Sequence, residues 1–368
     1  MTVQCGIYNM QNIIFASDSA VTTPDGKKYT GIQKIFKISD IHPAKMMING
    51  YMEFEKIPLK TLISDFTKKT DMRKLKTVKE ISNAFISFLH ENTETSTIDE
   101  YIKETLKYFK QDLNCEIRKH GFEKTLKSKQ KKPIPQFLRK YKNFDDEFKE
   151  LIPPEKRKKR YTKILWEIFS MEFNYLGTGV VIAGNNIDSY YPSFIELNIH
   201  YNDSEGVFYD IVESKFDFEE SIIRVYAINN EGYTFLTGSN ENYSEFIKCS
   251  VEYIRQIMLE NLIMELKKEK IEKYKEILEI CDRVFEEEFS HFDEIIENFK
   301  NESLNMASKS MEFIPSNILC TLADEIIRIT GIKEKISSEE EYVSISSHIS
   351  LINKSDGFKW VKFDDTIL

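Results

Sequence analysis

Hydrophobic and polar residues alternate at the start of the chain in the way that is typical of β-strands. Val3, Cys5 and Ile7 alternate with other residues, a polar stretch follows at 9–12, and residues 13–16 are apolar. Alternation with a period of two indicates a strand with one buried face, and two such runs joined by a polar turn predict an antiparallel hairpin.

Further strands are expected at intervals along the chain. Asn49-Gly50 ends one of them with a turn, and Asp356-Gly357 lies between the last two, which is a strong hairpin signal. The remaining runs with strand character are 34–38, 46–48, 179–184, 193–200, 206–212, 222–228, 346–353 and 358–363.

Helical spacing of apolar residues begins near residue 55 and predicts helices over 59–66 and 78–89. A third helix runs through 101–109, and the signature Ser96-Thr97-Ile98-Asp99 predicts its N-terminal cap. A last helix is expected to open at Pro315-Ser316 and to stop at Gly331.

A longer apolar stripe with 3-4 spacing runs from Tyr274 to Phe299, opposite a face of Glu and Lys. The favoured interpretation is a helix that faces the core, and an oligomer contact is the alternative. The order of strands and helices predicts an α+β fold in which helical blocks cover the faces of sheets. We expect one domain over 1–368, with a helical and basic insertion at 80–165 and a long helical insertion at 246–300.

Composition narrows the class of protein. The chain is 41% hydrophobic and 30% charged, with no apolar run near the roughly 18 residues that a membrane helix needs. The N-terminus lacks the charged-then-apolar plan of a signal peptide, so we expect a cytoplasmic protein. The five cysteines are scattered and the six histidines lack ligand spacing, so neither a disulfide framework nor a metal or other cofactor is expected.

Positive charge is concentrated in one part of a chain whose net charge is −9. Residues 103–163 hold 20 Lys or Arg against 9 Asp or Glu, so the remainder carries −20. Within this part, 127–163 contains four prolines and the basic run 156–160, and we expect it to be exposed and partly disordered. Because aromatic residues are only loosely spaced there, a solvated face is favoured over a nucleic-acid site.

Three residues near the N-terminus could form a catalytic group. Asp18 lies 16 positions after Thr2, and Lys34 lies 32 positions after it. If Met1 is removed, Thr2 carries a hydroxyl nucleophile and a free α-amine on one residue. A free α-amine has a pKa of about 7.7 to 8.0, which suits a general base, whereas the amide nitrogen that exists with Met1 in place has no useful basicity.

Several segments resemble proteasome β subunits and related bacterial ring proteases, which are N-terminal nucleophile (Ntn) hydrolases. The matching segments are Thr2-Val3, Ala16 to Thr22, Gln33 to Ile38, and Ile48 to Gly50, with weaker matches at 180–184, 192–197 and 340–345. The resemblance implies a four-layer α-β-β-α sandwich of two antiparallel sheets, here with two enlarged helical insertions. It also implies cleavage of an amide bond, most plausibly in a peptide or polypeptide.

The resemblance assigns a role to each matching position. Thr2 would be the nucleophile, Lys34 would lower the proton affinity of the Thr2 group, and Asp18 would hold Lys34 charged and oriented. The Gly50 N–H would face the oxyanion, a contact typically worth about a hundredfold to a thousandfold in rate. Supporting contacts from the second sheet would come from Ser344 or Glu340. The side-chain pocket would be lined by Val21, Thr22 and Tyr51.

Departures from the family pattern keep an alternative open. Ala20 stands where many β subunits have an Arg, Ser344-Ile345 replaces the expected glycines, and the helical insertions could obstruct a ring. Our main prediction, based on the matching segments, is nevertheless an N-terminal threonine peptidase that forms homo-oligomers. The alternative is a catalytically silent, proteasome-like subunit that contacts protein partners through its long helices.

Overall fold

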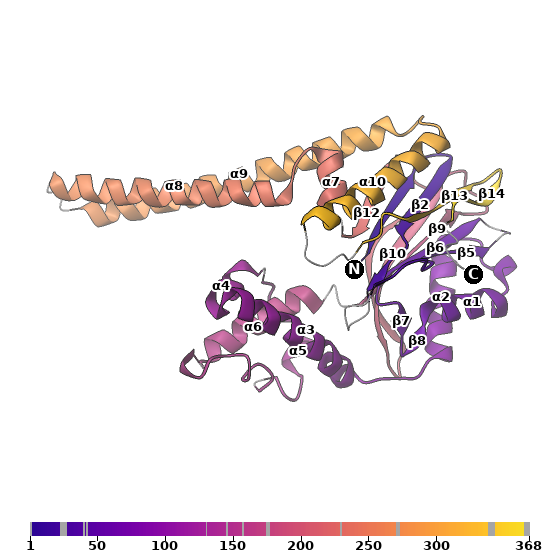
Figure 1. Ribbon diagram of the computed structural model, residues 1–368, viewed down its shortest axis with the longest axis horizontal. Coiled ribbons are helices and arrows are strands. Elements are labelled where there is room, and N and C mark those ends of the chain that lie inside the picture. The colour runs from indigo at the N-terminus through magenta and orange to yellow at the C-terminus, as the bar shows by residue number, and fades with distance from the viewer. Residues whose placement is uncertain are drawn as a thin grey trace.

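The computed structural model describes residues 2–22, 28–39, 41, 43–129, 131–144, 146–156, 158–173, 177–228, 230–269, 273–337 and 343–363. Over these residues the chain has a mixed α+β fold with two five-stranded antiparallel sheets (Figure 1). No helix in the described part of the chain combines the length and apolar character needed to cross a membrane.

The first sheet contains the N-terminal hairpin at its centre. Its order is β12 (Ile222–Ala227), β1 (Val3–Tyr8), β2 (Asn12–Asp18), β13 (Ser347–Asn353) and β14 (Gly357–Lys362). The register pairs Gln4 with Ser17 and Asp18 with Ser347, so the start of β1 and the end of β2 lie side by side at the same end of the sheet. The predicted hairpin and the Asp356-Gly357 turn are confirmed.

The second sheet is formed by β11 (Val207–Lys215), β10 (Pro192–Asn202), β9 (Thr178–Asn185), β6 (Ala44–Gly50) and β5 (Ile35–Ser39), in that order. Two small hairpins complete the strands: β3 (Val21–Thr22) with β4 (Lys28–Tyr29), and β7 (Glu53–Phe54) with β8 (Ile57–Pro58). Every strand expected from alternation is present in the two main sheets, with ends shifted by a few residues.

Helices cover the outer faces of both sheets. On the second sheet lie α1 (Leu59–Lys69) and α2 (Val78–Asn92), whose apolar residues share a core with Met46, Ile48 and Val180. On the first sheet lies α10 (Ser316–Ser337), next to α7 (Asn230–Thr237), sharing a core with Val3 and Ile14.

A third apolar cluster lies between the two sheets and explains why β1 and β2 are buried on both faces. Tyr8 stacks on Phe194 of the other sheet with ring centroids 4.7 Å apart, and its hydroxyl lies 3.0 Å from that of Tyr226. The alternation in the sequence indicated one buried face only, because it does not reveal a second sheet. The clusters are compatible with helix–sheet–sheet–helix layering.

The stretch 127–163, expected to be exposed and partly disordered, is folded over its described residues. It belongs to a helical unit made of α3 (Ile98–His120), α4 (Phe122–Ser128), α5 (Gln136–Arg139) and α6 (Lys159–Phe173). A 3₁₀ turn at Pro154–Lys156 lies within this unit, and another, at Met72–Lys74, lies before it in the chain. Trp166 stacks on Phe144 at 4.3 Å and donates to its carbonyl oxygen at 2.8 Å, and Phe148 is buried with them. The helical unit therefore has an apolar core of its own, distinct from the cores at the two sheets, and carries its basic side chains around that core.

The N-terminal cap of α3 is one residue later than the sequence signature suggested. The Thr97 hydroxyl accepts from the Glu100 N–H, and the Glu100 carboxylate accepts from the Thr97 N–H, which forms a capping box. Ser96 instead donates its hydroxyl to the Glu55 carboxylate at 2.9 Å. The predicted helix is thus confirmed with a different cap.

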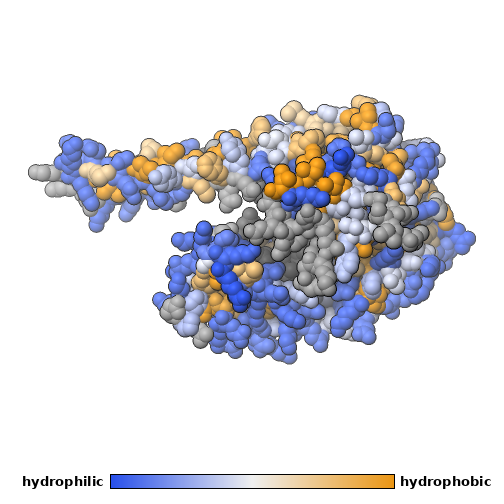
Figure 2. All heavy atoms as spheres, in the orientation of Figure 1, coloured by the Kyte–Doolittle hydropathy of each residue, from blue (hydrophilic) through white to orange (hydrophobic). Residues whose placement is uncertain are grey.

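The long helical region forms two helices, α8 (Glu241–Lys268) and α9 (Tyr274–Ser310), that pack on one another and project from the part of the molecule that holds the two sheets (Figure 1). The favoured core-facing interpretation of the 274–299 stripe is wrong for much of its length: Ile295 is 63% exposed and Phe299 is 56% exposed. Figure 2 shows hydrophobic residues on the surface along this hairpin. Helical spacing identified the apolar face but not what covers it.

Candidate functional site

The ends of three strands bring the predicted triplet together at the seam between the sheets. Thr2 directly precedes β1, and Asp18 is the last residue of β2 in the first sheet. Lys34 directly precedes β5 in the second sheet, and its side chain crosses to the first. The Thr2 carbonyl oxygen accepts from the Ile228 N–H at 2.9 Å, which extends the pairing with β12 to the nucleophile candidate.

The three side chains form a closed hydrogen-bonded triangle. The Lys34 ammonium lies 2.8 Å from Oδ1 of Asp18 and also donates to the Thr2 hydroxyl. That hydroxyl donates in turn to Oδ1 of Asp18. Thr2 is 6% exposed, Lys34 1% and Asp18 0%, so water screens these interactions little.

Backbone N–H groups complete the shell around the Asp18 carboxylate. Oδ1 accepts from the Val3 N–H at 3.1 Å. Oδ2 accepts from the Ala20 N–H at 3.1 Å and from the Ser344 N–H at 3.3 Å. Because each carboxylate oxygen has donors, the buried charge is compensated and held in one orientation.

Burial and the ion pair act in opposite directions on Lys34. Burial lowers the pKa of its ammonium group, and the charge and hydrogen bond of Asp18 oppose that shift. The protonated form of Lys34 therefore depends on Asp18. The triangle can orient a hydroxyl and set the proton affinity of groups near it.

Gly331 controls the approach of the segment that carries Ser344. α10 does not stop at Gly331, as the sequence suggested, but continues to Ser337. A Cβ at position 331 would lie 3.0 Å from the Ser344 carbonyl oxygen and 3.3 Å from the Ile345 nitrogen. Glycine is needed here for close packing of the chain that donates to Asp18, not for a helix end.

Gly50 is the last residue of β6 and follows two positions after Ile48, which lies opposite Lys34. The Ile48 N–H donates to the Lys34 carbonyl oxygen at 3.0 Å, and the Gln4 amide donates to the Ile48 carbonyl oxygen at 2.6 Å. Gly50 has φ +74°, and a Cβ there would lie 2.7 Å from the Gly177 carbonyl oxygen. Both the backbone conformation and the available space require glycine.

Gln4 contacts the strand that ends at Gly50 and was not among the predicted site residues. Its amide joins β1 to β6 through Ile48, and its carbonyl oxygen accepts from Asn49 at 3.3 Å. It is also fully buried. A polar residue at an inner position of an apolar strand was the available signal.

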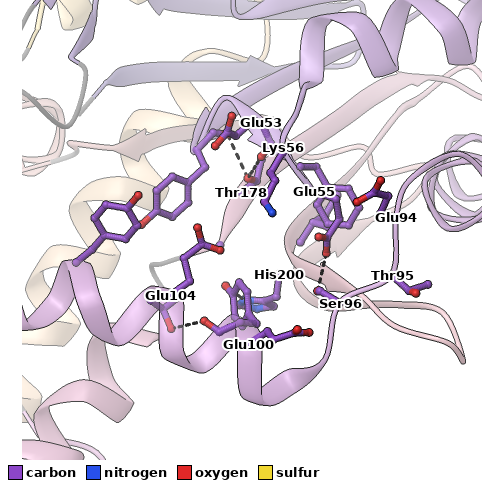
Figure 3. A pocket seen from close by; sticks show the side chains of 17 residues that line it. Glu53, Glu55, Lys56, Glu94, Thr95, Ser96, Glu100, Glu104, Thr178 and His200 are labelled. Carbon is purple, nitrogen blue, oxygen red and sulfur yellow. Dashed lines mark hydrogen bonds between the residues drawn. The ribbon is translucent and has the colours of Figure 1, made fainter. Parts of the chain in front are cut away.

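A cavity of about 410 Å³ begins immediately after Gly50. Tyr51 and Thr178 contribute to its wall from the second sheet, and Tyr101, Glu104 and Tyr108 contribute from α3 (Figure 3). Tyr51 thus lines a cavity; its role in binding a substrate stays a prediction. The contribution from α3 could not be predicted, since these residues lie about 50 positions away in the sequence.

The remaining predicted residues have different outcomes. Val21 is half-buried in the small β3–β4 hairpin, which Thr22 also joins through its backbone. Neither contributes to the cavity wall formed by the described residues. The Ser344 N–H donates to Asp18, but Ser344 precedes β13 in the same sheet as Asp18 and not in the second sheet, where the resemblance placed it; Glu340 lies outside the described residues.

Comparison with known proteins adds no family assignment. No model of a known protein family matches the chain, and no match is found among curated proteins. Among the described residues, no group of three or more His, Cys, Asp or Glu side chains is arranged to hold a metal ion. Function must therefore be argued from the buried triangle and the cavity beside it.

Proposed function

We propose that this protein is an N-terminal threonine amidohydrolase that cleaves peptides through an acyl-enzyme at Thr2 after removal of Met1. The observation that carries the proposal is the buried Lys34–Asp18 pair, which contacts the Thr2 hydroxyl from both sides. We further propose an Ntn-type α-β-β-α sandwich, which the layering of the core clusters supports.

A buried ion pair is a weak source of stability, because the cost of desolvating two charges offsets their attraction. Placing such a pair on a threonine hydroxyl needs a reason beyond folding. In an amidohydrolase, the Lys34 ammonium favours the deprotonated form of groups beside it, and Asp18 prevents Lys34 from losing its own proton.

The proposed reaction has two steps. The Thr2 amine takes the hydroxyl proton as Oγ1 attacks the carbonyl carbon of the peptide bond, and the Gly50 N–H donates to the resulting oxyanion. The amine then protonates the leaving nitrogen, so the C–N bond breaks and a Thr2 ester remains. Water, activated by the same amine, hydrolyses the ester and restores the hydroxyl.

Mass spectrometry of the intact protein tests this proposal directly. Protein purified from its own host should lack Met1 and should gain one equivalent of a β-lactone on Thr2. Thr2→Ser should retain labelling, because it keeps the hydroxyl, whereas Thr2→Ala should lose it. Retention of Met1 in the native host, or equal labelling of Thr2→Ala, would contradict the proposed mechanism.

A catalytically silent subunit that acts through protein contacts is the second candidate. The exposed apolar residues of the α8–α9 hairpin favour it, since such patches often mark interaction surfaces. Under this proposal, as under the oligomer hypothesis, the hairpin contacts another protein chain. Thr2→Ala should then leave cellular function intact, while loss of function in a folded Thr2→Ala protein would count against it.

A further inference from the structure

The cavity after Gly50 has the size of a ligand site. Its volume of about 410 Å³ falls within the range of about 300 to 1,000 Å³ that is common for such sites. It lies between the β7–β8 turn, the first turns of α3 and the ends of β9 and β10 (Figure 3). These elements are far apart in the sequence and meet here.

Charge in the cavity wall has one dominant sign. Five glutamates and one lysine line it, which gives a net charge of −4 with His200 neutral. Burial lowers the pKa of His200, although Asp210 opposes the shift. The cavity therefore repels anions and attracts cations.

Two of the five glutamates have structural partners. Glu55 accepts from the Ser96 hydroxyl and, at 2.7 Å, from the Asn202 N–H. Glu100 closes the capping box of α3. The other three, Glu53, Glu94 and Glu104, have no side-chain hydrogen bond or ion pair within the described part of the chain.

Aromatic rings add a second feature that suits a cation. Tyr51, Tyr101 and Tyr108 all line the cavity, and the faces of such rings attract ammonium and guanidinium groups. Burial raises the pKa of the Tyr51 hydroxyl, with further contributions from Tyr108, Asp112 and Glu104, so the Tyr51 hydroxyl stays neutral. Carboxylates beside aromatic faces form a site for an organic cation.

The chain neighbour and the strand partner of the proposed oxyanion donor, Gly50, both line the cavity. Tyr51 directly follows Gly50, and Thr178, the strand partner of Gly50, lines the cavity and donates its hydroxyl to the Tyr51 carbonyl oxygen at 3.1 Å. A peptide whose scissile carbonyl lies at the Gly50 N–H would have its adjacent side chain near this opening.

We propose that this cavity binds a lysine or arginine side chain of a peptide substrate, next to the bond that is cleaved. The assignment rests on the proposed function only for the position of the cleaved bond. An apolar side chain would have to remove water from carboxylates without replacing their hydrogen bonds, whereas an ammonium or guanidinium group supplies them.

Equilibrium binding to the full-length Thr2→Ala protein tests the cavity without turnover. The probes are three fluorescent acetyl-tetrapeptide amides that are identical except for Lys, norleucine or Glu at the last position. Lys and norleucine have similar length and differ by the charged amine. The Lys peptide should bind at least tenfold more tightly than the norleucine peptide, and added salt should reduce the difference.

Glu104→Gln, made in the same background, should reduce the preference for Lys at least threefold, chiefly by weakening binding of the Lys peptide. Glu260→Gln is the matched control, because Glu260 is an exposed residue of α8 outside the cavity. Equal binding of the Lys and norleucine peptides, or no binding of the Lys peptide at millimolar concentration, overturns the proposal.

A covalent experiment separates this proposal from the proposed function. Wild-type protein is treated with peptide epoxyketones that carry Lys or norleucine beside the reactive group, and the rate of Thr2 adduct formation is measured. If the cavity prefers the Lys peptide but no Thr2 adduct forms, the proposed peptidase is refuted and the cation site stands. If the Lys and norleucine compounds bind equally and form the adduct at equal rates, the cation site is refuted and the peptidase stands.

Discussion

Replacing Asp18 should destabilise the protein more than replacing Lys34, because the two charges have unequal support. Asp18→Asn leaves the Lys34 ammonium 1% exposed with no anion beside it. In addition, Oδ1 and Oδ2 each accept from at least two groups, so whichever way the new amide is turned, its NH₂ faces donors. Removing one partner of a buried pair typically costs about 3 to 5 kcal/mol.

Lys34→Met leaves a better compensated charge. The Asp18 carboxylate keeps the N–H groups of Val3, Ala20 and Ser344 and the Thr2 hydroxyl, and Met fills a similar volume. We expect a loss of about 1.5 to 3 kcal/mol, the range for a lost hydrogen bond to a charged group. The double variant should lose less than the sum of the two single variants.

Urea unfolding followed by circular dichroism at pH 7 and pH 9.5 measures these differences. The folded-state pKa of Lys34 is lowered, and Asp18→Asn should lower it further, so the unfolded chain binds more protons at neutral pH. The deficit of Asp18→Asn relative to wild type should therefore shrink as the pH rises towards the unfolded lysine pKa of about 10.4. A larger loss in Lys34→Met, or strict additivity, would refute the reasoning.

Three further variants test other parts of the structure. Gly331→Ala should slow β-lactone labelling of Thr2 while the protein still folds, because the new Cβ displaces the Ser344 segment; labelling at the wild-type rate would contradict this. In urea unfolding, Lys45→Met should compare more favourably with wild type at pH 7 than at pH 9.5, because burial lowers the pKa of Lys45 well below its usual range, whereas its hydrogen bonds to the Ile13 and Ser350 carbonyl oxygens are lost at both pH values; an equal difference at the two pH values would contradict this. Trp166→Ala should cost about 3 to 5 kcal/mol in thermal unfolding, since the ring packs in the core of the helical unit; a loss below 1 kcal/mol would show that this core is not needed.

Local patterns predicted the strands and several helices because those signals lie within a few residues. Alternation identified the β1–β2 hairpin, and Asp356-Gly357 identified the last turn. Spacing of apolar residues also identified α9, but it could not show that Phe299 faces outward, because exposure depends on distant parts of the chain. Gly331 was misinterpreted for the same reason: its neighbour in space is Ser344.

The candidate site was predictable only in part. The resemblance to Ntn hydrolases implied that Thr2, Asp18 and Lys34 lie together, and the structure brings them into contact. The role of Gln4 depends on the packing of one sheet on the other, and the N–H of Ser344 reaches Asp18 through the pairing of β13 with β2, which lie more than 300 residues apart in the chain, so no local pattern encodes either contact. Composition also failed for 127–163, where abundant lysines concealed the aromatic residues that form a core.

The nucleophile candidate and the cavity depend on different parts of the fold. Thr2, Asp18 and Lys34 are held by the ends of β1, β2 and β5, so the packing of the two sheets determines their geometry. The wall of the cavity includes α3, which belongs to the helical unit with its own core. Substitutions on the cavity side of α3, such as Glu104→Gln, should therefore change selectivity among peptides without changing the rate at which a β-lactone that lacks a peptide side chain labels Thr2. If the rate of Thr2 labelling falls together with selectivity, the cavity and the nucleophile candidate are coupled. The packing of the two sheets then does not by itself determine the reactivity of Thr2.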